Sequence, residues 1–111
     1  MSQDHNFHQT DLPVQMQILN ISVNMARIGE LVLKFGEGKS ELREKFLVQT
    51  QSYLADLDST NVSGAFLPTL EMFNRAFGRL RKEAVNSRNQ QLWAERAITW
   101  ADILQIRSRL V

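Results

Sequence analysis

The sequence LPVQMQILNISVNMARIGELVLKF, residues 12–35, decides the fold because two apolar stripes run along it. The first stripe has the alternating three- and four-residue spacing of a helix face and comprises Val14, Ile18, Ile21, Met25, Ile28, Val32 and Phe35. The second stripe has the same spacing and comprises Leu12, Met16, Leu19, Val23 and Ala26, then Leu33 after an interruption at Glu30. Because a two-residue offset on a helix is a rotation of about 200°, the stripes lie on opposite sides. We therefore expect one continuous helix that must be covered from both sides.

The ends and flanks of this helix can also be predicted. Asp11 can cap its start, and Gly36 and Gly38 can end it by supplying the positive φ common at a helix C-terminus. On one flank, Gln15, Ser22 and Gly29 are seven residues apart and mostly small. Small residues at this spacing would let a neighbouring helix approach closely.

Two further helices follow. Ser40 is a suitable cap for the second, whose apolar face comprises Leu42, Phe46, Leu47, Tyr53, Leu54 and Leu57. Residues 58–64 are nearly all turn formers and predict a loop. The third helix begins near Pro68, with Ser63 and Thr69 as alternative caps. Its core face comprises Phe66, Leu70, Phe73, Phe77, Leu80 and Ala84.

A fourth helix is expected after a turn near Asn86–Ser87. The apolar face of the third helix changes phase before Trp93, and Ser87 and Gln90 have the spacing of a capping box. The alternative is one long helix with a phase slip. The predicted face of the fourth helix comprises Trp93, Ala97, Trp100, Leu104 and Val111, widened by Leu92, Ile103 and Leu110.

These elements predict an all-α fold, a four-helix antiparallel bundle in which the third and fourth helices could be partly continuous. Short connections favour antiparallel neighbours. Residues 11–111 are long enough for a single helical-bundle domain, and the polar residues 1–10 are expected to form a flexible tail.

Composition narrows the classes of function. The 111 residues include 13 basic and 12 acidic side chains, so no strong overall field favours nucleic acid or an anionic membrane. The charges are uneven, since residues 71–88 carry five bases and two acids. There is no cysteine, which excludes disulfides and thiolate chemistry. With no apolar run near the ~18 residues of a membrane span and no signal peptide, we expect a cytoplasmic protein without membrane contact.

The sequence offers little for catalysis or cofactor binding. His5 and His8, with Asp4 or Asp11, could hold a metal ion only on a rigid frame, and we expect them in the flexible tail. The segment Gly36–Ser40 resembles the end of a phosphate-binding loop, but it follows a helix rather than a strand. We therefore predict no catalytic, metal or cofactor site, and expect a protein that is not an enzyme.

Two surfaces remain as candidates for interaction. The first comprises Leu12, Met16, Leu19 and Val23, through which we expect a homodimer; the alternative is a monomer whose other helices enclose residues 12–35 completely. The second is a basic patch on the third helix, comprising Arg75, Arg79 and Lys82. It would suit an acidic protein better than nucleic acid, and the i, i+4 spacings Glu71–Arg75 and Arg79–Glu83 favour an ordinary solvated face. Trp93 and Trp100 could line a ligand slot, but core packing is the simpler expectation.

Overall fold

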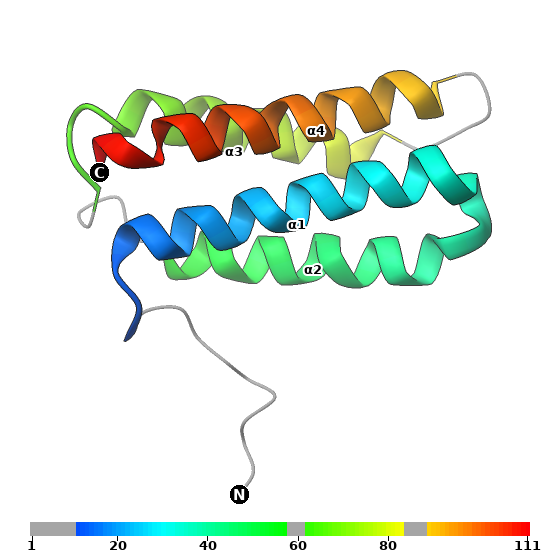
Figure 1. The fold of residues 1–111 in the computed structure, drawn as a ribbon, viewed down its shortest axis with the longest axis horizontal. Coiled ribbons are helices and arrows are strands. Elements are labelled where there is room, and N and C mark those ends of the chain that lie inside the picture. Colours follow the sequence, from blue (N-terminus) through cyan, green and yellow to red (C-terminus); the bar gives the residue numbers. More distant parts are fainter. Residues whose placement is uncertain (1–10, 58–61, 84–88) are drawn as a thin grey trace, which may run out of the picture.

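The computed structural model describes residues 11–57, 62–83 and 89–111, which form four α-helices and two short 3₁₀-helices. The α-helices are α1 (Val14–Phe35), α2 (Ser40–Asp56), α3 (Leu67–Lys82) and α4 (Gln90–Arg107). The 3₁₀-helices are η2 (Gly36–Lys39) and η4 (Ser108–Leu110). Consecutive α-helices run antiparallel, and α1 lies between α2 and α4 (Figure 1). No strand occurs in the described ranges, so the predicted all-α bundle is confirmed.

The third and fourth helices are separate. α3 ends at Lys82, and Glu83 has the extended backbone angles φ −75° and ψ 126°. The alternative prediction, one long helix that continues from α3 through Glu83 into α4, is therefore wrong. The predicted turn at Asn86–Ser87 lies outside the described residues, as does the serine of the expected capping box.

The start of α1 differs from the prediction by two residues. The helix begins at Val14, with Pro13 at the N-cap position and no side-chain cap. The predicted Asp11 cap is therefore wrong, because Asp11 lies too far before the first helical N–H groups. The side-chain amide of Gln17 donates to the backbone carbonyl of Leu12 at 2.9 Å.

At the other end of α1, Gly36 has φ +55° and its N–H donates to the carbonyl of Val32, as the sequence predicts. Gly38 does not have a positive φ and belongs to η2, so that part of the prediction is wrong. Ser40 is the first residue of α2 and makes no capping bond. Before α3, by contrast, the hydroxyl of Ser63 accepts from the N–H of Phe66 at 3.2 Å, which selects Ser63 over Thr69.

Small residues join α1 closely to α4. A Cβ placed on Gly29 would lie 2.5 Å from Cγ1 of Ile98 and 2.8 Å from the carbonyl oxygen of Ala94. On the same flank of α1, seven residues before Gly29, the hydroxyl of Ser22 donates to the carbonyl of Ala101 at 2.7 Å. The expectation that this flank permits a close helix approach is confirmed.

The buried face of α4 is turned relative to the prediction. Trp93, Ala97 and Leu104 are buried as expected, but Leu92 and Leu110 are 50% and 43% exposed. Buried alanines at positions 94 and 101, which face α1, take their place. The face was misjudged because alanine contributes little to a pattern of large apolar side chains.

Large aromatic side chains fill the space between α3 and the other helices. Phe66, Phe73 and Phe77 are buried, and the rings of Phe73 and Phe77 lie 5.7 Å apart. The indole N–H of Trp93 donates to the carbonyl of Leu80 at 3.1 Å. That carbonyl lies in the last turn of α3, so the indole of Trp93 supplies a donor to one of the carbonyls at the end of the helix.

Candidate functional site

Three of the four residues predicted for self-association, Met16, Leu19 and Val23, lie on the side of α1 opposite its buried stripe, and Leu12 lies just before the helix. Leu12 and Leu19 are half-buried, while Met16 and Val23 are each 46% exposed. The exposed Arg27 lies one turn after Val23 on this face, followed by the exposed Glu30. The described helices therefore leave the middle of an apolar stripe open to solvent, whereas complete enclosure of α1 would bury it.

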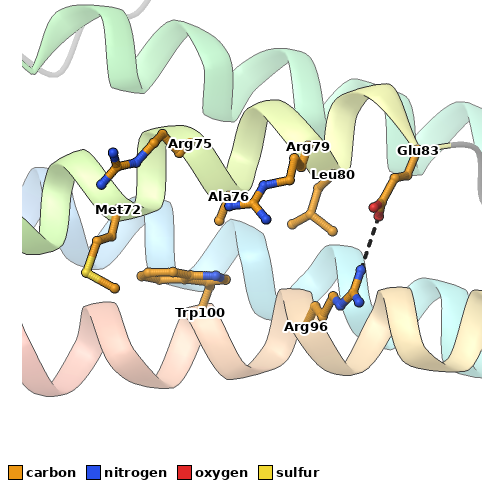
Figure 2. A pocket seen from close by; sticks show the side chains of 8 residues that line it. All are labelled: Met72, Arg75, Ala76, Arg79, Leu80, Glu83, Arg96 and Trp100. Carbon is orange, nitrogen blue, oxygen red and sulfur yellow. Dashed lines mark hydrogen bonds and ion pairs between the residues drawn. The ribbon is translucent and has the colours of Figure 1, made fainter.

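A second feature is the groove between α3 and α4, which has a volume of about 690 Å³. Figure 2 shows that residues from both helices line it, with Arg75 and Arg79 on α3, Arg96 on α4 and the Trp100 ring between the two helices. The lining residues are Met72, Arg75, Ala76, Arg79, Leu80 and Glu83 from the α3 side, and Arg96 and Trp100 from α4.

The floor of the groove is apolar. Trp100 is half-buried, and its ring packs at a tilt against Phe73 with the ring centroids 5.4 Å apart. Met72 lies beside it and is 54% exposed (Figure 2). The prediction of Trp100 as a core residue is thus half right, since one side packs on the core and the other lines the groove. Trp93, in contrast, is buried.

The charges at the rim differ from the expected arrangement. Within the described residues, neither Arg75 nor Arg79 forms an ion pair, although both were expected to pair with glutamates on their own helix. Glu83 instead pairs with Arg96 of α4 at 3.4 Å (Figure 2). The extended backbone at Glu83 takes its carboxylate out of the α3 register and toward α4. Two guanidinium groups are therefore left available at the groove.

Lys82, the third residue of the predicted basic patch, does not line this groove. It lines a separate recess of about 410 Å³ near the end of the bundle, together with Arg81 and Glu44. Arg81 and Glu44 form an ion pair of 3.4 Å there. The structure thus brings Arg75 and Arg79 together and places Lys82 elsewhere.

Sequence reasoning missed Met72, Arg96 and Trp100 as members of one surface. Arg96 and Trp100 are four residues apart on α4, as Arg75 and Arg79 are on α3, so each pair could be assigned to one helix face. That the two faces meet depends on how the helices dock, which the spacing within either helix does not contain.

The side chains that line the groove suit binding of an anionic group with an apolar part. Guanidinium groups bind carboxylates and phosphates through paired, charge-assisted hydrogen bonds, and Trp100 and Met72 offer apolar contact next to them. The segment Gly36–Ser40 joins two helices, as expected for a turn rather than a phosphate loop. In the described ranges, no three His, Asp or Glu side chains are grouped so that they could hold a metal ion. His5 and His8 lie outside those ranges.

Among the described helices, none combines the length and the apolar character needed to cross a membrane. Comparison with protein-family models, with curated proteins and with solved structures finds no match to this chain.

Proposed function

We propose that this protein is a small helical interaction module that forms a homodimer through the outer face of α1. The supporting observation is that Met16 and Val23, on the same apolar face of α1 as Leu19, are each 46% exposed. Single exposed apolar residues are normal on protein surfaces, but a continuous row of them along one helix favours a partner. The contact surface comprises Met16, Leu19 and Val23 of α1 together with Leu12, which lies just before the helix.

A two-fold arrangement suits this surface because a homodimer uses the same patch on both copies. With the axis next to Leu19 and the two copies of α1 antiparallel, Met16 of one copy lies opposite Val23 of the other. α1 has 22 residues, and at a rise of 1.5 Å each it is about 33 Å long. One helix pair of this length gives an interface at the small end of the specific range, so we expect a dissociation constant of roughly 10–100 µM.

The test is light scattering or sedimentation over a range of concentrations spanning that value. Val23→Glu should give a monomer at every concentration, because dimerisation would bury an unpaired carboxylate on each copy. The matched control is Val48→Glu on α2, where the same side chain is 52% exposed and the same charge is added. Wild-type protein that stays monomeric, or equal loss of the dimer in both variants, would refute the proposal.

Cross-linking tests the position of the axis independently. Because the chain has no cysteine, Leu19→Cys introduces a unique thiol that should oxidise to a disulfide-linked dimer. Val48→Cys should remain monomeric under the same conditions. Equal cross-linking of the two variants would show random collision rather than a dimer through α1.

A further inference from the structure

We infer that the groove between α3 and α4 is a second binding site, and that it takes an acidic segment of a partner protein with an apolar side chain beside its carboxylates. This site is on other helices than the proposed dimer contact and does not depend on it. Its occupant follows from two properties of the lining, which are the charge of the rim and the apolar floor.

The arginines at the rim of the groove favour a partner that carries carboxylates at a defined spacing. Arg75 and Arg79 are one turn apart on α3, which places them about 6 Å apart along the helix axis. Neither forms an ion pair within the described residues, so both guanidinium groups can donate hydrogen bonds to an anion of a partner. Two carboxylates one helical turn apart on a partner helix would match both guanidinium groups in the paired geometry that arginine favours.

The floor of the groove favours contact with an apolar side chain of the partner. Trp100 and Met72 lie next to the two arginines, and Met72 has more than half of its surface exposed. A leucine or similar side chain beside the two carboxylates on the partner helix would cover both Trp100 and Met72. Binding would then combine an apolar anchor with a charged rim, the usual composition of a protein interface.

A nucleic acid fits the same surface less well. Trp100 could stack on a base, but the carboxylate of Glu83 closes one end of the groove and Glu71 lies one turn before Arg75. A continuous phosphate chain would meet both carboxylates. The chain also lacks the broad positive field on which nucleic-acid affinity depends, since its net charge is +1.

The probe is a labelled helical peptide with two glutamates four residues apart and leucines next to them along the same helix face, compared with its glutamine counterpart. The readout is the indole N–H signal of Trp100 in a ¹⁵N-correlated NMR spectrum, with that of the buried Trp93 as an internal control. The acidic peptide should shift the Trp100 signal and leave Trp93 nearly unchanged. The glutamine peptide should bind at least about tenfold more weakly, since it loses both charge-assisted contacts.

Variants of the protein complete the test. Arg75→Gln/Arg79→Gln should weaken binding of the acidic peptide at least about tenfold. The control Lys34→Gln/Lys45→Gln removes the same net charge from α1 and α2 and should leave affinity within about twofold. The inference is overturned if the acidic peptide leaves the Trp100 signal unmoved, or if both double variants lose equal affinity. Tighter binding of a single-stranded oligonucleotide would favour nucleic acid, and loss of dimers in Arg75→Gln/Arg79→Gln would favour a second copy; either result overturns it.

Discussion

Replacing Gly29 with alanine should destabilise the protein, even though alanine is the better helix former. The added Cβ would lie 2.5 Å from Cγ1 of Ile98 and 2.8 Å from the carbonyl oxygen of Ala94. Carbon atoms pack at about 3.5–4.0 Å, so α1 and α4 would have to separate by about 1 Å. Overpacking of this kind costs about 1–3 kcal/mol, against a gain of about 1 kcal/mol in helix propensity. Because the Ala94 oxygen is backbone and cannot change rotamer, we expect a net loss of about 1–2 kcal/mol.

Gly78 provides the matched control, since it is exposed in the middle of α3 and an added Cβ would meet nothing within 4 Å. Gly78→Ala should therefore gain up to about 1 kcal/mol, and the two variants should differ by about 1–3 kcal/mol. Urea denaturation followed by far-UV circular dichroism measures both. Ile98→Ala should destabilise the Gly29→Ala protein less than it destabilises wild type, because it also removes one of the two clashes. A Gly29→Ala protein as stable as wild type would refute the reasoning.

Two further predictions concern the half-buried Tyr53 and the buried Trp93. Burial raises the pKa of Tyr53 above its ordinary value of 10.0, with Arg27 opposing and Asp56 adding to the rise. The unfolded phenol therefore ionises first, so the free energy of unfolding should hold below pH 10 and fall as the pH rises through the folded pKa. Tyr53→Phe should remove this slope, and because Tyr53 is the sole tyrosine its ultraviolet absorbance titration checks the shift directly. Trp93→Phe should cost about 1–3 kcal/mol in urea unfolding, since it removes the indole donor to the Leu80 carbonyl; a loss near zero would contradict that role.

The helices could be predicted because large apolar residues repeat along them at helical spacing. Ile18, Ile21 and Met25 are buried on one side of α1 as the first stripe indicates. The caps were harder, since capping depends on the backbone of a single residue, and the predicted bonds at Asp11 and Ser40 are absent. Phe35, the last member of the first stripe, is exposed because the chain turns away directly after it.

The candidate surfaces differ in how far the sequence reveals them. The outer stripe of α1 follows from the period of a single helix, so its residues could be named in advance. The groove requires the relative rotation of α3 and α4, and that rotation depends on short side chains such as Ala94 and Ala101 packed against α1. Arg79 does not pair with Glu83 because of the extended backbone at Glu83, and only the folded chain determines that backbone conformation.

The close contact between α1 and α4 also limits where this chain can change in length. Ser22 and Gly29 are seven residues apart, and so are their counterparts Ala101 and Ala94 on the facing helix. An insertion between Ser22 and Gly29 would rotate one half of α1 by about 100° and direct a larger side chain at α4. An extra residue in η2, none of whose residues is buried, would leave this register unchanged. Insertions and deletions among natural variants should therefore fall in the connections and spare the paired seven-residue segments.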